Sequence, residues 1–254
     1  MPKQELLFTT RIMNAAGALG FAPDNRGLVD FTLLSAFITN PVSMKSRAPA
    51  RGERCLSFPG GFLIHTGLPN PGLKRVVQRY ARRWERSAMP IIVHLVAQYP
   101  DELTAMIERL ELIEAVMGIE IGLPPDVDPM LAYDLVSAAL GELPIIVRLP
   151  MERGLELGLA LGELGVSAFS LAPPRGSLIS ERGELVSGRL YGPSVYPIAL
   201  RAVQNMVEVG ISVIGSGGLF HDGDVDSMLA TGAMAVQLDA VLWRGGTNFV
   251  TPKT

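Results

Sequence analysis

The sequence predicts a (β/α)8 barrel (a TIM barrel) with a short N-terminal hairpin, an α/β fold. Three observations support this fold class. The chain has 254 residues, and such barrels use about 250 residues as one domain. Apolar residues make up 48% and charged residues 19%, which allows a large buried core and excludes global disorder. Short runs rich in Ile and Val also alternate with amphipathic segments, as in a parallel sheet covered by helices.

Eight segments are predicted as strands. Each is short and lacks strict alternation of apolar and polar residues, which is typical of parallel strands buried on both faces. They are residues 12–15, 36–39, 91–96, 117–121, 145–149, 168–171, 211–214 and 235–238. The expected hairpin spans about residues 5–13, ahead of the barrel.

Six amphipathic segments between the strands are predicted as helices. The first has a dense basic face, which we expect to be solvated, and the second follows Pro100 with Asp101, a common N-cap residue. The segments are residues 73–84, 101–112, 129–140, 153–164, 195–209 and 222–230. Eight strand–helix repeats indicate the barrel. A doubly wound open sheet is the alternative, but no Gly-x-Gly-x-x-Gly follows the first strand.

Two long stretches, residues 40–61 and 173–193, have the Pro- and Gly-rich composition of loops. Connections of about twenty residues are longer than usual, which favours functional loops. No charge block or low-complexity linker divides the chain, so residues 1–254 are expected to form a single domain.

The charge balance and the cysteine count exclude several classes of function. Lys and Arg number 22 and Asp and Glu 25, for a net charge of −3. The chain therefore lacks the excess of positive charge that is typical of proteins that bind nucleic acid or an anionic membrane. The lone Cys55 excludes an internal disulfide or a multi-cysteine metal site. The N-terminus has no apolar signal segment, and no apolar run approaches the roughly 18 residues of a spanning helix. We expect a cytoplasmic protein that acts on a small molecule.

A glycine-rich turn follows the seventh predicted strand, in Ile214-Gly215-Ser216-Gly217-Gly218. Backbone amides in such a turn can approach an anion closely, and the helix after it adds partial positive charge. This is the usual phosphate position of the fold, although a simple tight turn has the same composition. Gly192 and Arg189 could add donors. Asp239, after the eighth strand, would repel a phosphate unless it points away or pairs with Arg189.

Five segments resemble one known family in order and spacing. They are Asn14-Ala15-Ala16-Gly17, Pro59-Gly60-Gly61-Phe62-Leu63-Ile64-His65-Thr66-Gly67-Leu68-Pro69-Asn70-Pro71-Gly72, Ile146-Val147-Arg148-Leu149-Pro150, the run from Gly192 to Arg201, and Ile214 to Gly218. Over nearly the whole chain, the sequence resembles the dihydroorotate dehydrogenase family, FMN-dependent barrels of pyrimidine biosynthesis. The resemblance implies FMN as cofactor and an oxidoreductase activity.

Both sets of binding residues follow from this resemblance. The candidate cofactor-binding residues are Ala16, Gly17, Asn40, Arg148, Arg189, Gly192, Gly217, Gly218 and Asp239. The candidate substrate-binding residues are Gly67, Leu68 and Asp126.

Several positions depart from the family pattern. Where the family has Thr-Lys-Ser after the second strand, this chain has Thr39-Asn40-Pro41. Where the family has an asparagine that holds the substrate, this chain has Ile64. Its Asn-x-Ser-Cys-Pro-Asn, which carries two amides and in some branches the catalytic Cys or Ser, is Gly122-Leu123-Pro124-Pro125-Asp126. An asparagine pair after the sixth strand is Ala172-Pro173, and the flavin-facing lysine is Arg148.

These departures predict that dihydroorotate is not the substrate. Orotate is a planar, amide-rich carboxylate that needs several convergent hydrogen-bond partners. Each buried partner left unpaired costs on the order of 1–3 kcal/mol, and a missing base costs roughly 10²–10⁴ in rate.

His65, His94 and Glu120 are the candidate catalytic residues, because they fall at or near strand ends that face the barrel mouth. Such a set could perform acid–base chemistry. Its spacing is no metal signature, so no metal is expected, and each histidine could equally be a hydrogen-bonded structural residue. Cys55 is expected to be structural.

Three functions therefore remain open at the level of sequence. The first is a flavin enzyme of altered specificity. The second is a degenerate barrel that serves as a binding or assembly subunit. The third is a lyase or isomerase for a phosphate-bearing ligand that uses Glu120, His65 or His94. A homo-oligomer is the expected state, with a hetero-complex as the alternative.

Overall fold

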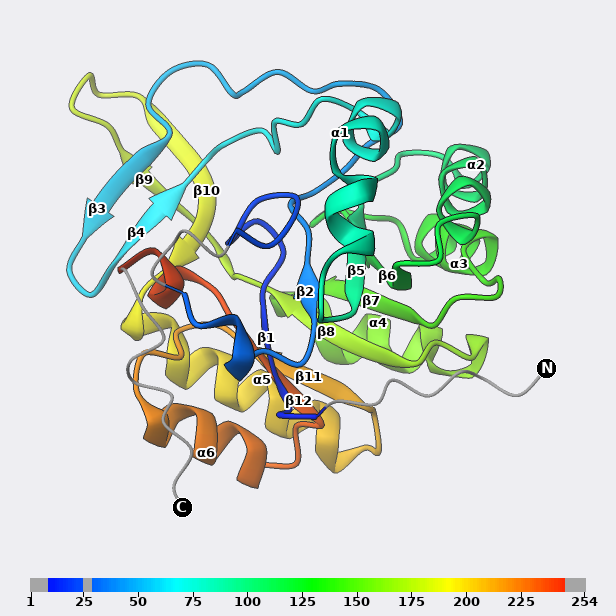
Figure 1. The fold of residues 1–254 in the computed structure, drawn as a ribbon. Coiled ribbons are helices and arrows are strands. Elements are labelled where there is room, and N and C mark those ends of the chain that lie inside the picture. Colours follow the sequence, from blue (N-terminus) through cyan, green and yellow to red (C-terminus); the bar gives the residue numbers. More distant parts are fainter. Residues whose placement is uncertain (1–8, 25–28, 245–254) are drawn as a thin grey trace.

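The computed structural model describes residues 9–24 and 29–244, and within them it shows the expected barrel (Figure 1). Eight strands pair side by side in the order β1-β12-β11-β8-β7-β6-β5-β2, and every neighbouring pair is parallel. The strands are β1 (Ile12–Asn14), β2 (Phe37–Ile38), β5 (Ile91–Leu95), β6 (Val116–Gly122), β7 (Ile145–Pro150), β8 (Ala168–Ala172), β11 (Val213–Ser216) and β12 (Ala235–Leu238). All eight predicted strands are confirmed, each within a few residues of its predicted bounds.

The barrel closes where β1 meets β2. A parallel bridge joins Met13 to Ala36. The buried Asn14 side chain extends this seam, because its Nδ2 donates to the carbonyl of Ile38 at 2.6 Å and its Oδ1 accepts from the amide of Ile38 at 3.0 Å. A side-chain amide thus replaces the ladder bonds that these two short strands lack.

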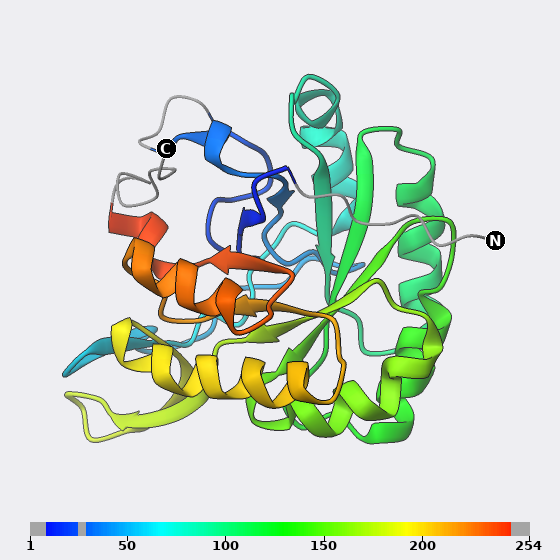
Figure 2. The ribbon, with the colours of Figure 1, turned by 90° about the horizontal axis from the view of Figure 1, so that it is seen from below.

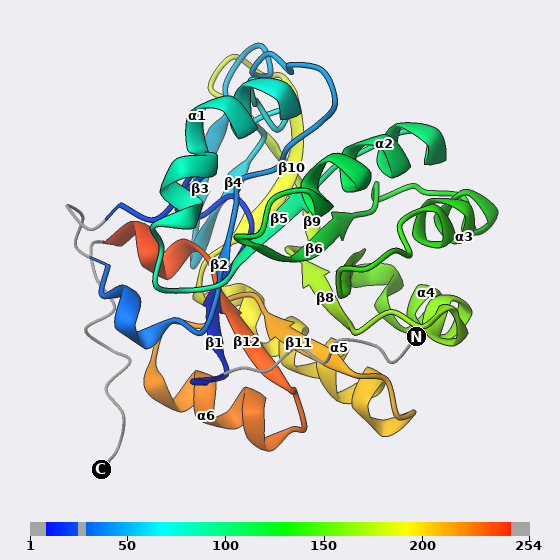
Figure 3. The ribbon, with the colours of Figure 1, turned by 45° about the vertical axis from the view of Figure 1, so that its right-hand side comes forward.

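Within residues 9–24 and 29–244, six α-helices are assigned, and they cover the outside of the barrel (Figures 2 and 3). They are α1 (Leu73–Glu85), α2 (Pro100–Glu111), α3 (Pro129–Ala138), α4 (Gly154–Leu161), α5 (Tyr196–Glu208) and α6 (Asp222–Ala230). The prediction of six helices is confirmed. In the described chain, only short 3-10 turns at Phe31–Leu33 and Ala240–Arg244 accompany the first and last strands.

Residues 5–8 of the predicted hairpin lie outside the described residues. Its described end belongs to the barrel, because Ile12 and Met13 pair in parallel with Val236 and Gln237 of β12.

The two stretches predicted as loops contain three of the four strands of a second sheet, so that prediction was wrong. Strands β3 (Cys55–Phe58), β4 (Gly61–Ile64), β10 (Leu185–Tyr191) and β9 (Arg175–Ile179) form an antiparallel sheet in the order β3-β4-β10-β9. Figure 1 shows this sheet beside the carboxyl ends of the barrel strands. Glycine is required for this pairing: a Cβ at Gly188 would lie 2.5 Å from the carbonyl oxygen of Ile64. Glycines that allow close strand contact therefore gave these segments the composition of loops.

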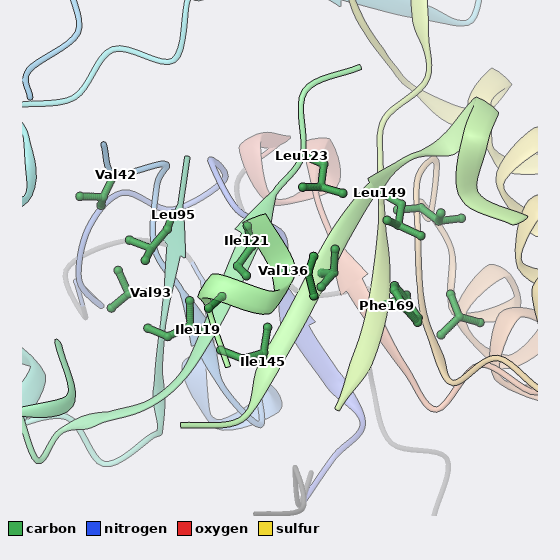
Figure 4. Close-up of a cluster of buried hydrophobic side chains, with 14 of the residues drawn as sticks. Val42, Val93, Leu95, Ile119, Ile121, Leu123, Val136, Ile145, Leu149 and Phe169 are labelled. Carbon is green, nitrogen blue, oxygen red and sulfur yellow. The ribbon is translucent and has the colours of Figure 1, made fainter. Parts of the chain in front are cut away.

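The main apolar core lies between the barrel strands and the helices. Figure 4 shows part of it, with Ile119 and Ile121 of β6, Leu149 of β7 and Phe169 of β8 in one cluster with Val136 of α3. Because successive side chains of a strand point to opposite faces, the residues between these point into the barrel.

Inside the barrel, an apolar layer lies at the amino ends of the strands. It contains Met13, Ala36, Ile38, Ile92, Ile146, Ala168, Ile214 and Ala235. Two residues further along five of the strands lies a buried polar layer, which consists of His94, Arg148, Ser170, Ser216 and Gln237, with Glu120 of β6. The chain thus places its buried polar groups just below the barrel mouth, where barrel enzymes hold their active sites. No described helix is long and apolar enough to cross a membrane.

Candidate active site at the barrel mouth

A cavity of about 360 Å³ opens at the carboxyl ends of the strands, between the barrel and the antiparallel sheet. Its volume is that of a small-molecule site. Predicted cofactor residues Ala16, Gly17, Asn40 and Arg189 line it, as do predicted substrate residues Gly67 and Leu68. Asn40 also holds the loop after β1, because its Oδ1 accepts from the amide of Gly20 at 3.0 Å.

The lining carries positive charge without a carboxylate. Arg47, Arg175 and Arg189 contribute guanidinium groups and His65 an exposed imidazole, whereas none of the described Asp and Glu residues lines the cavity. Tyr191 and Trp243 add aromatic surface, with ring centroids 5.3 Å apart. Trp243 is fixed by a hydrogen bond from its Nε1 to the carbonyl of Ala18 at 2.9 Å.

Glu120 is the centre of the buried polar layer. Its Oε2 lies 2.6 Å from Nδ1 of His94. Its Oε1 accepts hydrogen bonds from Ser170 Oγ at 2.8 Å and from Gln237 Nε2 at 2.6 Å. Nη1 of Arg148 lies 3.6 Å from Oε2. Glu120 is fully buried, so these four neighbours are what make an ionised carboxylate tolerable there.

The charge states of this layer follow from its contacts. Burial alone would raise the pKa of Glu120, but the charge of Arg148 and the hydrogen bonds from His94 and Gln237 outweigh it and lower the pKa to about 2. Burial lowers the pKa of His94, against the opposing effect of Glu120. At neutral pH the pair is therefore a carboxylate and a neutral imidazole. The hydrogen bond to the carboxylate assigns the proton to Nδ1, which leaves a lone pair on Nε2.

His94 fills the space that a side chain at position 122 would occupy. A Cβ built on Gly122 would lie 2.7 Å from Nε2 and 2.9 Å from Cε1 of His94. Gly122 itself lines the cavity. The imidazole thus lies directly behind the cavity wall, at the position where the family carries an asparagine side chain.

Arg148, near the end of β7, is buried with unsatisfied hydrogen-bonding capacity. The residue is 2% exposed, and neither Nε nor Nη1 has a hydrogen-bond partner among the described residues. A buried guanidinium without hydrogen bonds is costly, so Arg148 is a group that an anionic or carbonyl-bearing ligand would satisfy.

Asp239, just after β12, is a second buried carboxyl group. It does not pair with Arg189 in the described structure, contrary to one of the two predicted alternatives; its Oδ1 accepts instead from the amide of Ala240 at 2.5 Å. Burial raises the pKa of Asp239 to about 6, although that hydrogen bond and the charge of Arg148 oppose the rise.

This raised pKa predicts a pH-dependent stability. The folded state binds the Asp239 proton more tightly than the unfolded chain does, so its contribution to stability falls as the pH rises from about 4 to about 6 and then stays low. We expect Asp239→Asn, which keeps an acceptor for Ala240, to raise the free energy of unfolding by roughly 2–3 kcal/mol at pH 7.5 and by little at pH 4. Urea unfolding of both proteins at the two pH values measures this difference. An equal difference at both values would contradict it.

The structure brings together only some of the predicted site residues. His94 and Glu120 are in contact, whereas His65 lies on the exposed cavity rim, and the described residues hold no His, Cys, Asp and Glu cluster suited to a metal. Asp126 is exposed and does not line the cavity, so the structure does not bring it to the other predicted substrate residues. Gly192, Gly217 and Gly218 also lie outside the lining of this cavity.

The sequence reasoning missed Ser170, Gln237, Tyr191 and Trp243. The first two could have been found from strand periodicity, because each lies two residues after an inward apolar residue, Ala168 and Ala235 respectively. Tyr191 and Trp243 reach the cavity through the antiparallel sheet and the turn after β12, for which the sequence carried no clear signal.

Together the fold and the cavity define a barrel with a cationic small-molecule site at the carboxyl ends of its strands, the usual arrangement of a barrel enzyme. A family model described as dihydroorotate dehydrogenase matches residues 4–131. The chain belongs to the dihydroorotate dehydrogenase family, which confirms the resemblance predicted from the sequence.

Several curated proteins are similar to this chain over most of their length. The chain is 30% identical to the dihydroorotate dehydrogenase B (NAD(+)) catalytic subunit of Geobacter sulfurreducens over 262 residues, covering 95% of this chain and 84% of that protein. Proteins of the same name from Trichlorobacter lovleyi, at 30% identity, and Desulforudis audaxviator, at 28%, match with coverage of 95% of this chain and 84% and 83% of their own.

Proposed function

We propose that the chain is a flavin oxidoreductase of this family that binds FMN at the barrel mouth and acts on a small molecule other than dihydroorotate. The observation that carries this proposal is Arg148. Its guanidinium is buried, lacks hydrogen bonds at Nε and Nη1, and comes from β7 at the barrel mouth. The family's flavin-facing lysine occupies the same position in the sequence.

The residues fit the ring system of a flavin. Ala16, Gly17 and Asn40 line the cavity and leave it free of bulky side chains on that side. Arg148 would supply a cation and donors to the electron-rich edge of the ring, and such charge tunes the electronics of a bound cofactor. Arg148 and these three residues would therefore hold the ring.

The phosphate end fits less well. In this fold a phosphate usually lies between two segments: the turn that follows β11 and the first residues that follow β12. The glycines of that turn are present, with Gly217 at φ 107° and Gly218 at φ 72°. The buried carboxyl of Asp239 stands where β12 ends and would repel a phosphate unless it is protonated. We therefore expect weak FMN binding.

When bound, FMN would supply the transfer of a hydride or of electrons to and from the substrate. The chain would supply proton handling and binding. We propose His94 as the base, because its Nε2 lone pair lies behind Gly122 and Glu120 holds its other nitrogen. His65 and the backbone of Gly67 and Leu68 would contact the substrate from the rim.

Titration with FMN tests the cofactor proposal. We expect flavin-free protein to bind FMN, and Asp239→Gly to bind it more tightly, by roughly tenfold for about 1.4 kcal/mol of repulsion removed. Quenching of FMN fluorescence measures both affinities. The matched control is Asp126→Gly, an exposed aspartate away from the cavity, which should bind like the original protein.

The opposite results are equally clear. Equal affinity of the original protein and Asp239→Gly would show that the phosphate lies elsewhere. No binding by either protein would overturn the flavin function and favour a barrel that acts as a binding or assembly subunit.

The proposed enzyme would work in the cytoplasm, as its composition predicts, and would act on a small molecule rather than on nucleic acid. We propose a homo-oligomer. The relatives are named as catalytic subunits, which makes a hetero-complex the alternative for this chain.

A further inference from the structure

Arg47, Arg175 and Arg189 line the cavity, and within the described structure none of the three guanidinium groups forms an ion pair. The nearby carboxyl groups are engaged elsewhere: Glu120 with His94 and Arg148, Asp239 with the amide of Ala240, and the exposed Glu152 with the backbone amide of Arg175. Lining charge of one sign in a partly enclosed space attracts ligands of the opposite sign.

Arg175 and Arg189 form the densest part of this charge. They are direct partners in the antiparallel register of β9 and β10, so both side chains stand on the same face of the sheet. Both line the cavity at the barrel mouth, and both line a smaller adjoining pocket with Glu152. Like charges placed opposite each other on neighbouring strands destabilise the pair. An anion between them would remove that repulsion.

We propose that Arg175 and Arg189 hold a carboxylate of the substrate, which makes the substrate a small organic acid. This inference names a substrate class for the proposed oxidoreductase and so rests on that function. Two guanidinium groups can each bind a carboxylate through paired N–H donors, which fixes its orientation as well as its charge.

One part of the lining favours an acid with a short apolar body, while Asn40, His65 and Thr66 supply polar side chains elsewhere in the cavity. Ile64, Gly122 and Pro124 line the cavity without a polar side-chain atom. A substrate rich in amide groups would leave its donors and acceptors unpaired against these residues. An acid with a short apolar body would place its carboxylate at the arginines and its carbon chain against Ile64 and Pro124.

Calorimetric titration of the FMN-loaded protein with glutarate tests this inference. Glutaramide, of nearly the same shape without charge, is the matched control ligand. We expect glutarate to bind, and Arg189→Gln and Arg175→Gln each to weaken binding by roughly 10-fold to 100-fold, the value of a charged hydrogen bond. Arg182→Gln removes the same charge from the exposed turn between β9 and β10 and should leave the affinity unchanged. Glutaramide should bind at least tenfold more weakly than glutarate.

Arg175 is exposed, so Arg175→Gln remains informative even if Arg189→Gln fails to fold. No glutarate binding, or binding that neither variant weakens, would overturn the inference. Binding seen only in the flavin-free protein and lost on saturation with FMN would also overturn it, because the arginines would then hold the phosphate of FMN. If FMN does not bind at all, arginine-dependent glutarate binding by the flavin-free protein would support the acid site while the flavin function fails.

Discussion

Replacing Glu120 by alanine is expected to lower the free energy of unfolding by about 3–5 kcal/mol at pH 7, the cost of breaking a buried ion pair. The carboxylate accepts from Ser170 and Gln237, contacts His94 and lies beside Arg148. Its removal would take away the carboxylate that lies 3.6 Å from the buried Arg148 guanidinium. Urea unfolding followed by circular dichroism measures the loss.

The pH dependence of this loss provides a second check. The pKa of Glu120 is lowered to about 2 in the folded protein, so its contribution is complete above pH 4.5 and disappears as the pH falls through 2. The difference between the two proteins should therefore shrink in that window. Glu156→Ala, which breaks the exposed ion pair with Arg153, is the control and should leave stability unchanged. An equally small loss for Glu120→Ala would show that the polar layer does not depend on this charge.

Dihydroorotate should be oxidised by the FMN-loaded protein at or near the background rate. The structure places Asn40, Ile64, Gly122 and Pro124 around one cavity, and at these positions the family carries a lysine, two asparagines and a serine. Each lost partner costs on the order of 1–3 kcal/mol, so the combined loss amounts to several orders of magnitude in rate. Orotate formation followed by absorbance measures it, with the Geobacter sulfurreducens relative assayed alongside. Turnover at ordinary enzymatic rates would contradict the prediction.

The barrel was predictable from sequence because its signal is local. Runs such as residues 145–147 are apolar throughout, since both faces of a barrel strand are buried. The antiparallel sheet was not predictable in the same way. Its strands are partly exposed and interrupted by Gly61 and Gly188, and what makes them strands is contact between segments more than 100 residues apart, as in the pairing of Arg189 with Ile64.

The candidate site was predictable where it depends on strand order. His94 and Glu120 were expected together because their strands are consecutive, and the register pairs them directly. Ser170 and Gln237 could not be assigned to the site from strand order alone. Only the closed barrel brings β8 and β12 close enough to β6 for both side chains to contact Glu120. The expectation that His65 joins this group failed because His65 follows β4 of the antiparallel sheet rather than a barrel strand.

The contact between Gly122 and His94 restricts the order in which this chain could have diverged from its relatives. An asparagine at position 122 and an imidazole at position 94 cannot occupy the same space, because even a Cβ at Gly122 would lie 2.7 Å from Nε2. A chain with an asparagine at 122 could therefore acquire a histidine at 94 only after, or together with, the loss of the side chain at 122. In the present chain, an asparagine at 122 would disrupt the barrel interior unless His94 were replaced first or in the same step. Steric exclusion thus fixes the order in which substitutions at these two positions can be accepted.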